Sequence, residues 1–247
     1  MVTTYAHFAR YYDALMRSPD GDADPLANAA RIRGYLARHH PDARSLLELG
    51  CGTGAVLGGL RAVGSLTGLD RSPQMLERAR AKLPDARFVQ ARMTSFDLGE
   101  RFDAVICVFD TVNHLPRFAL WDALFERTAR HLHDGGLFAF DVNTVGQLRR
   151  LVTSGPWACE LPDAHVTQEV EPRGGGSFIW HVHIRERLGE HHERIVELGV
   201  ELARIDAALG RWFTLLESSD GDGAPPTDES ARAYFAYRRR PRAQTGG

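Results

Sequence analysis

The chain has 247 residues, of which 43% are hydrophobic and 25% are charged, and this composition is enough for the core of one large soluble domain. Its net charge of -2 excludes a nucleic-acid binder that works through a basic face. The three scattered cysteines form no CxxC pair, and no apolar run reaches the roughly 18 residues of a membrane span, so we expect a cytoplasmic protein with neither a disulfide framework nor a membrane segment.

The first half of the chain alternates between the apolar periodicity of helices and short apolar segments typical of strands. We expect helices at residues 26–39, 55–63, 72–83 and 118–132, and strands at residues 45–49, 65–70, 86–91, 102–109 and 137–142. Such alternation predicts βαβ units with right-handed crossovers and therefore a mostly parallel sheet. The expected fold class is α/β, a Rossmann-like doubly wound sheet.

After residue 145 the pattern changes to period-two alternation, in residues 165–172 and 177–187, with a glycine-rich turn between them. This predicts an antiparallel hairpin laid over the main sheet. A helix at 192–209, a strand at 210–217, a polar loop at 218–230 and a strand at 231–240 are expected to follow. We therefore predict three parts: a Rossmann-like domain (1–144, with an N-terminal lid at about 1–25), a β-hairpin cap (145–188), and a C-terminal part (189–247) that completes the sheet with an antiparallel closing strand.

A cluster of glycines follows the expected strand at 45–49, in the stretch LLELGCGTG. Gly50, Gly52 and Ala55 satisfy the G-x-G-x-x-G/A dinucleotide fingerprint, and Asp70 lies 20 residues after Gly50, which would suit an NAD-linked oxidoreductase. Glu48 argues against that interpretation, because a carboxylate just before the turn is an unfavourable neighbour for a pyrophosphate.

Four stretches together resemble the class I S-adenosylmethionine-dependent methyltransferases: LLELGCGTG, TGLDRSPQML, FDAVICVFDTVNHL and LHDGGLFAFDVNT. The N-terminal stretch YAHFARYYDALM is similar to that of small-molecule members, notably the sugar N,N-dimethyltransferases of antibiotic biosynthesis. The resemblance implies a Rossmann-like domain that binds S-adenosylmethionine and an enzyme that methylates an amine or hydroxyl of a small molecule, in bacterial secondary metabolism. An NAD-linked oxidoreductase and a non-catalytic cofactor-binding protein are the alternatives.

The resemblance also implies a set of cofactor-binding residues. Asp70 would accept hydrogen bonds from both ribose hydroxyls, and the glycines would let the backbone approach the cofactor. The full set is Tyr11, Glu48, Gly50, Gly52, Gly54, Asp70, Arg71, Met75, Met93 and Val108. Arg92 stands where the family usually has an acid that reads adenine. Either the backbone reads adenine here, or cofactor binding is weakened, and the second reading motivates the non-catalytic alternative.

Candidate acceptor-side residues follow the expected strand at 102–109, at the sheet edge where open α/β sheets bind ligands. His114 is either a general base or a helix-start histidine that packs on the loop, and Asp110 would orient the substrate or the cofactor. Asn113, Trp157 and Trp180 are candidate substrate residues. An amine acceptor that arrives as the free base would need no catalytic base.

Histidines at 181, 183, 191 and 192 are close in sequence, but no acid or cysteine is spaced to complete a metal site, so we predict no metal. The expected partners are a small-molecule acceptor and, in a homodimer, a second copy of the chain. The sequence leaves the oligomeric state open.

Overall fold

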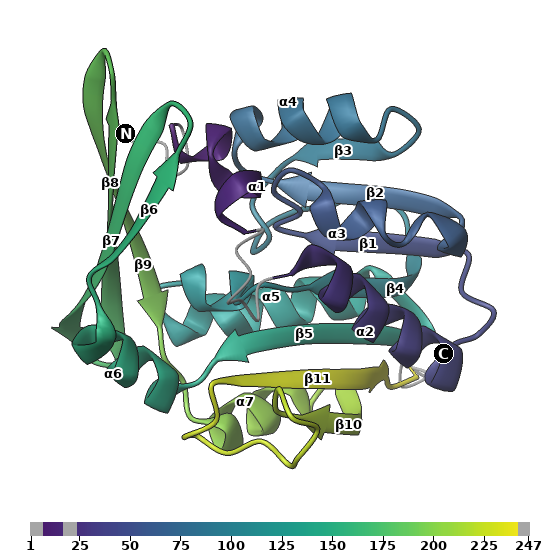
Figure 1. Ribbon diagram of the computed structural model, residues 1–247. Coiled ribbons are helices and arrows are strands. Elements are labelled where there is room, and N and C mark those ends of the chain that lie inside the picture. The colour runs from purple at the N-terminus through teal and green to yellow at the C-terminus, as the bar shows by residue number, and fades with distance from the viewer. Residues whose placement is uncertain (1–6, 17–23, 242–247) are drawn as a thin grey trace.

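The computed structural model describes residues 7–16 and 24–241, which form two β-sheets with helices around the larger one (Figure 1). The larger sheet has seven strands in the order β10-β11-β5-β4-β1-β2-β3, and the smaller has four in the order β6-β7-β8-β9. The predicted α/β class, with a mostly parallel sheet and a small antiparallel sheet, is confirmed. Within the described ranges, no helix combines the length and the apolar character needed to cross a membrane.

Five parallel strands carry the large sheet, and an antiparallel pair closes it. The parallel strands are β1 (Ser45–Leu49), β2 (Ser65–Asp70), β3 (Arg87–Gln90), β4 (Phe102–Cys107) and β5 (Leu132–Asn143). The closing strand β11 (Arg232–Arg239) pairs antiparallel with β5, and β10 (Phe213–Ser219) pairs antiparallel with β11. The crossovers leave the carboxyl ends of the parallel strands at one edge, where the functional residues gather.

Helices cover both faces of the large sheet, and each face has its own core. The side with α5 (Phe118–Arg130) and α7 (Leu202–Leu209) is rich in aromatic residues. The side with α2 (Pro25–His39), α3 (Ala55–Gly58) and α4 (Pro73–Lys82) is mainly aliphatic. Helix starts follow from the sequence: Asp24 caps α2 and Ser72 caps α4, and a proline occupies the first position of each.

The helix predicted at 55–63 is shorter in the structure. Helix α3 ends at Gly58, and residues Arg61–Val63 form the 3-10 turn η2. Glycine is a poor helix former, and at Gly59 a Cβ atom would lie 2.5 Å from that of Ala29, so the chain uses this glycine to pack against α2.

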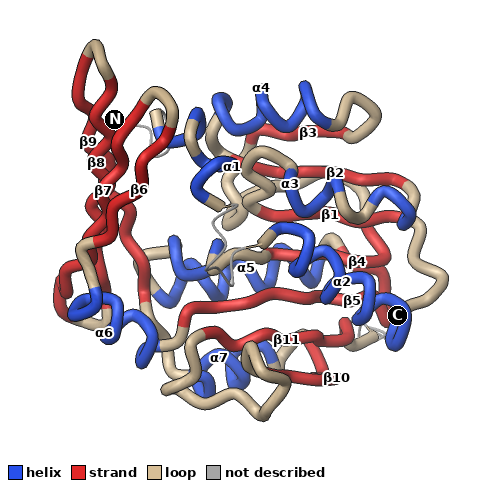
Figure 2. Tube along the Cα trace, in the orientation of Figure 1, coloured by secondary structure: helices blue, strands red, loops and turns tan. Residues whose placement is uncertain are grey.

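The cap is larger than the predicted hairpin. Its strands are β6 (Trp157–Leu161), β7 (Ala164–Gly174), β8 (Ser177–Glu186) and β9 (Gly189–Leu198), and helix α6 (Val145–Ser154) leads into it. In Figure 2 this sheet stands beside the edge where the parallel strands end, with the N-terminal segment, η1 (Phe8–Arg10) and α1 (Tyr12–Leu15), between the two sheets.

The helix predicted at 192–209 is wrong over its first half. Residues up to Leu198 form β9, which pairs with β8 from Gly189 to Leu198, and only α7 is helical. The cap sheet therefore continues past its predicted end at residue 188. Ile195 and Val196 favour a strand, and β8 supplies a partner for the whole segment, so pairing overrides the helical spacing.

Candidate active site

Two cavities of about 460 and 590 Å3 open around the turn that follows β1. They share the wall formed by Tyr12, Gly50, Gly52, Phe109 and Thr111. We call the cavity that also contains Asp70 and His114 the first cavity, and the one that contains Glu48 the second cavity.

The glycine turn is tightly packed at Gly50 and Gly54 but leaves open space next to Gly52. Gly50, Gly52 and Gly54 have φ angles of 69°, 51° and 73°, a region that residues with side chains rarely adopt. A side chain at Gly50 would collide with Thr111, and one at Gly54 would press on Leu83 at 3.2 Å. Gly52 differs, because nothing lies within 4 Å of an added Cβ atom. The backbone at Gly52 is thus the part of the turn that a ligand can approach closely.

Asp70 ends β2 and holds the glycine turn in place. Its carboxylate accepts hydrogen bonds from the backbone N–H of Gly52 at 2.9 Å and of Ser72 at 2.8 Å. Burial raises the pKa of Asp70, while these hydrogen bonds and Arg71 oppose the rise. A carboxylate has about four lone-pair sites, so it retains capacity for hydroxyl donors in the first cavity, which it lines.

Glu48 is a buried carboxyl group, 3% exposed, at the end of β1. Its Oε2 atom has no hydrogen-bond partner among the described residues, and it lines the second cavity. Burial, followed by the neighbouring charge of Asp70, raises the pKa of Glu48 well above its usual value. A positive group bound in this cavity would satisfy the unpartnered oxygen and stabilise the carboxylate.

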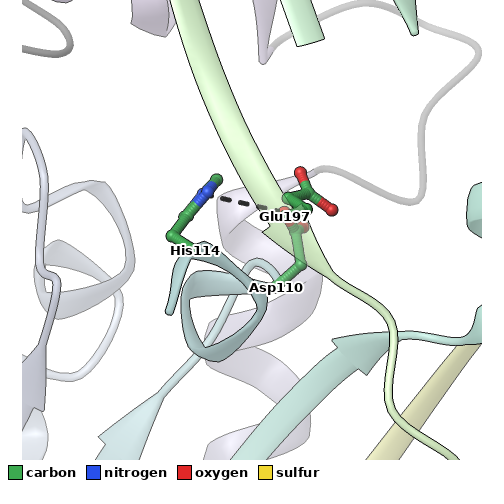
Figure 3. Close-up of side chains that lie close together, drawn as sticks. All are labelled: Asp110, His114 and Glu197. Atoms are coloured by element: carbon green, nitrogen blue, oxygen red, sulfur yellow. Dashed lines mark ion pairs between the residues drawn. The ribbon is translucent and has the colours of Figure 1, made fainter. Parts of the chain in front are cut away.

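His114 closes η3 (Thr111–His114) and lines the first cavity. Burial lowers its pKa to about 4, and the positive charge of Arg71 contributes in the same direction. The imidazole is therefore neutral at pH 7 and weakly basic. Its Nε2 atom lies 3.9 Å from Oδ2 of Asp110, which is too long for a hydrogen bond (Figure 3).

Comparison with known proteins identifies the family. A family described as "Methyltransferase domain" matches residues 46–136. A dTDP-3-amino-3,6-dideoxy-alpha-D-glucopyranose N,N-dimethyltransferase from Streptomyces fradiae is 42% identical over 44% of this chain and 43% of its own. A trans-aconitate 2-methyltransferase from Azoarcus sp. is 33% identical over 58% of this chain and 57% of its own. The first curated relatives are thus matched over about half of their length.

Solved structures extend the likeness over almost the whole chain. An S-adenosylmethionine-dependent methyltransferase from Clostridium acetobutylicum superposes with a TM-score of 0.82 at 20% identity, covering 96% of this chain and 99% of that one. A sugar N-methyltransferase from Streptoalloteichus sp. gives 0.72 at 26% identity, covering 93% of each. Residues 46–136 of this chain match the methyltransferase family, and the whole chain has the fold of these solved methyltransferases. The predictions of the family and of its cofactor, S-adenosylmethionine, are confirmed.

Most of the other residues that the sequence predicts to bind the cofactor line one of the two cavities. Arg71, Met75 and Met93 line the first cavity, and Val108 and Gly54 line the second. Arg92, the residue in place of the usual acid, lines the first cavity as well. The cofactor contacts themselves stay a prediction.

Tyr11, the predicted cofactor contact in the N-terminal segment, lines neither of the two cavities. It is buried against the cap and its hydroxyl donates to Glu186 at 2.8 Å, whereas Tyr12 lines both cavities. The next residue, Asp13, accepts a hydrogen bond from the Thr53 hydroxyl at 2.6 Å and so ties this segment to the glycine turn. In a short irregular helix neighbouring side chains point in different directions, and the aromatic spacing alone could not tell which one faces the ligand.

Asp110 lies behind His114 in a buried charged cluster and lines neither cavity. Arg232 contacts it at 2.8 Å and also contacts Asp141 at 2.6 Å. The backbone N–H groups of Phe109 and Asp110, both at positive φ, donate to Asp141. These contacts hold the η3 turn, and a contact of Asp110 with the substrate or the cofactor stays a prediction.

Glu197 on β9 joins this cluster, although the sequence analysis placed it on a helix. One imidazole nitrogen of His114 and one carboxylate oxygen each of Asp110 and Glu197 lie within 4.8 Å of one another, and Figure 3 shows the three side chains. Burial, followed by the charge of Asp110, raises the pKa of Glu197 well above its usual value. Arg232 offsets part of the negative charge of the cluster, and the contacts within the cluster join strand β9 of the cap to the η3 turn.

The three residues predicted to bind the substrate line neither of the two cavities. Asn113 is fully buried, and both of its amide N–H groups donate, to the carbonyls of Asn143 and Leu198 at 3.0 Å. Its carbonyl accepts from the Asn143 N–H at 3.1 Å, so the buried side chain joins η3 to β5 and β9. Trp157 and Trp180 stack with ring centroids 6.0 Å apart inside the cap and line neither cavity.

Proposed function

We propose that this protein transfers the methyl group of S-adenosylmethionine to a nucleophilic atom of a small molecule in bacterial secondary metabolism, and that this atom is an amine nitrogen. The observation that carries the proposal is the arrangement of Gly52, Asp70 and Glu48 around two cavities that share part of their wall. An open backbone approach, a carboxylate for hydroxyl groups and a buried carboxyl oxygen without a hydrogen-bond partner among the described residues match the cofactor's sugar and its charged amino-acid tail.

The residues that line the two cavities would bind different parts of the cofactor. Asp70 would hold the ribose hydroxyls in the first cavity, with Met75 and Met93 beside the adenine. Glu48 would meet the ammonium group of the tail in the second cavity. The bound cofactor supplies a methyl group on a positive sulfur atom, and this group would lie near Tyr12, which borders both cavities. Orientation and exclusion of water by the cap strand β9 and the N-terminal segment then favour the transfer.

An amine acceptor is supported by the weak basicity of His114. A base with a pKa of about 4 gives little driving force for removing the proton of a hydroxyl group. An amine that binds as the free base already presents a lone pair and needs no base for the attack. The relatives point the same way, because three of them are N,N-dimethyltransferases that act on dTDP-linked amino sugars.

The cofactor assignment is tested by comparing ligands in calorimetry. We expect S-adenosylhomocysteine to bind and NAD not to bind, and we expect methylated product from a panel of amino sugars and other amines drawn from the surrounding gene cluster. Binding of NAD without S-adenosylhomocysteine would favour the oxidoreductase alternative. Binding of S-adenosylhomocysteine without turnover on any acceptor would favour the non-catalytic alternative.

A pH–rate profile of the His114→Ala variant distinguishes the two acceptor types. With an amine acceptor we expect a loss of turnover below about tenfold, most of which is recovered at higher pH because more acceptor is then neutral. With a hydroxyl acceptor the expected loss is roughly 10²–10⁴ and persists at high pH. A large loss that high pH does not recover, measured with an amine, would make His114 an essential base and contradict the orientation mechanism.

A further inference from the structure

Three histidines gather on one face of the cap sheet. His181 and His183 lie on β8, and His192 lies directly opposite His183 on the edge strand β9. Side chains alternate between the two faces of a sheet, and the intervening residues Val182 and Ile184 pack with the N-terminal segment. The three histidines therefore lie on the face that is turned away from the N-terminal segment, and His183 and His192 are exposed.

Two of these histidines present ring nitrogens to each other. Nδ1 of His181 lies 3.1 Å from Nε2 of His192. Two nitrogens that bind the same tetrahedral zinc ion are about 3.3–3.4 Å apart, because each zinc–nitrogen bond is roughly 2.0–2.1 Å long. A small shift of either ring would therefore bring both nitrogens to bonding distance from one metal ion. The ring of His183 packs on that of His192, with centroids 4.2 Å apart and planes inclined by 9°, which limits the rotation of His192.

A carboxylate faces the other ring nitrogen of His181. In the sequence no acid is spaced to complete a metal site with these histidines, but strand pairing brings Glu169 and Glu171 of β7 to the same face. Oε1 of Glu171 lies 2.9 Å from Nε2 of His181. Histidines that bind metal usually direct their second ring nitrogen at a carboxylate or carbonyl, which fixes the tautomer. A proton on Nε2, beside Glu171, leaves the lone pair of Nδ1 facing His192.

Two carboxylates and one guanidinium group lie around this pair of histidines. Glu169 and Arg194 are directly opposite His181 on the two neighbouring strands. With Glu171 added, the three charged side chains carry a net negative charge, and neutral imidazoles do not change it. This part of the face therefore attracts a cation, and the charge of Arg194 weakens the attraction.

We propose that His181 and His192 bind a divalent transition-metal ion, of the class of Zn²⁺, Ni²⁺ and Cu²⁺, through Nδ1 and Nε2 respectively, with Glu171 orienting His181. Imidazole suits these ions, whereas Mg²⁺ and Ca²⁺ prefer oxygen ligands. The ion takes the place of the proton between the two nitrogens, and this proton moves to the other nitrogen of its own ring, so both histidines stay neutral. Water molecules complete the coordination. The inference replaces the prediction that the chain binds no metal, and it does not depend on the proposed function.

A metal ion at this position would join β8 to the edge strand β9. The opposite face of β9 holds other parts of the protein in place. Glu193 accepts hydrogen bonds from the backbone N–H groups of His7 and Phe8 at 2.8 and 2.9 Å, and Glu197 belongs to the cluster with Asp110. Metal binding would therefore stabilise the strand that links the cap to the N-terminal segment and to the η3 turn.

The test titrates Zn²⁺ into the full chain, prepared without a histidine tag and freed of metal by a chelator. Calorimetry should show saturable binding of one ion per chain, and Mg²⁺ should not replace it. We expect His181→Ala and His192→Ala each to weaken the binding by at least about tenfold. The matched control is His165→Ala, because His165 lies on the same face of β7 and its Nδ1 also meets a carboxylate, that of Glu160 at 2.6 Å. This control should bind Zn²⁺ like the wild type.

Two further variants test the role of the charged neighbours. Glu171→Gln should weaken Zn²⁺ binding by about tenfold, because the amide no longer fixes the tautomer of His181. Arg194→Gln should strengthen binding by roughly two- to fivefold, since it removes a positive charge that also acts on His192. An unchanged affinity in Glu171→Gln, or weaker binding in Arg194→Gln, would contradict the proposed arrangement.

Three results would overturn the site itself: no saturable Zn²⁺ binding by the wild type, unchanged affinity in both histidine variants, or an equal loss in the control. Binding that survives in the histidine variants but is lost in Glu197→Gln would place the ion in the cluster with Asp110 instead. Thermal unfolding without metal shows whether each variant is folded, and the exposed His192 keeps the test decisive if His181→Ala is unstable. No cofactor is present in these titrations, so their failure would leave the proposed function untouched.

Discussion

Replacing Gly52 by valine should abolish binding of S-adenosylmethionine and S-adenosylhomocysteine while the protein stays folded. The added Cβ atom meets no atom of the described residues within 4 Å, and Gly52 lines both cavities, so the branched side chain would extend into cavity space. It would therefore displace the cofactor instead of colliding with the protein. Calorimetry should show a loss of affinity of at least about a hundredfold, because the turn cannot move away without breaking the hydrogen bond from Gly52 to Asp70.

The control for this variant is Gly99→Val. Gly99 has a φ of 68° and, like Gly52, has nothing within 4 Å of an added Cβ atom, but it lies in a surface turn between β3 and β4. Both substitutions carry a similar backbone strain, on the order of 1–2 kcal/mol. We expect comparable losses of stability in urea and a loss of cofactor binding only at Gly52. Retained affinity in Gly52→Val would show that the cofactor lies elsewhere.

The positions of the glycine turn and of Asp70 could be predicted because their signals are contiguous in sequence. A buried strand followed by the glycines at 50, 52 and 54 defines a turn, and Asp70 ends the neighbouring strand. Parallel pairing of β1 with β2 brings the two ends together without help from distant residues. The order of residues over a short stretch of sequence is therefore enough to predict the turn and its neighbour Asp70. The structure adds which glycine has open space next to it.

The acceptor half depends on directions that sequence spacing does not encode. Asn113 and His114 are neighbours on the short η3 turn, yet one side chain points into the protein and the other into the first cavity. Glu197 and Arg232 reach the cluster from strands far along the chain. The segment around Ile195 also fits both periods, since its apolar residues can be read as a helix face or as a strand face. Pairing with β8, a long-range contact, decides between them.

The directions of the side chains in the cap could not be predicted from the sequence either. Tryptophan is common in binding pockets, but Trp157 and Trp180 pack on each other. They also belong to the cap core, which contains Leu148, Val170 and Phe178. The part of the cap that lines the first cavity is the β9 segment Arg194, Ile195 and Val196, which the sequence analysis expects to be helical. Cytoplasmic location and a homodimer stay predictions, because neither follows from the fold of one chain.

Replacing Asp70 by alanine should weaken binding of S-adenosylmethionine and S-adenosylhomocysteine alike, by on the order of 2–4 kcal/mol. The two ligands share the ribose, so a residue that binds ribose must affect both to a similar extent. Asp70 also accepts from the N–H groups of Gly52 and Ser72, and losing these bonds would loosen the glycine turn. A simple loss of affinity therefore does not separate a direct contact with ribose from an effect on the turn.

A thermodynamic cycle, in which both the protein and the ligand are changed, separates a direct contact with ribose from an effect on the turn. S-adenosylhomocysteine and its analogue without the ribose 2′-hydroxyl are each titrated against wild type and Asp70→Ala. If Asp70 accepts from this hydroxyl, the analogue binds the wild type about tenfold more weakly or worse, and the variant hardly distinguishes the two ligands. If the hydroxyl is worth the same in both proteins, Asp70 acts only by holding the turn, and the ribose must be bound by other residues of the first cavity.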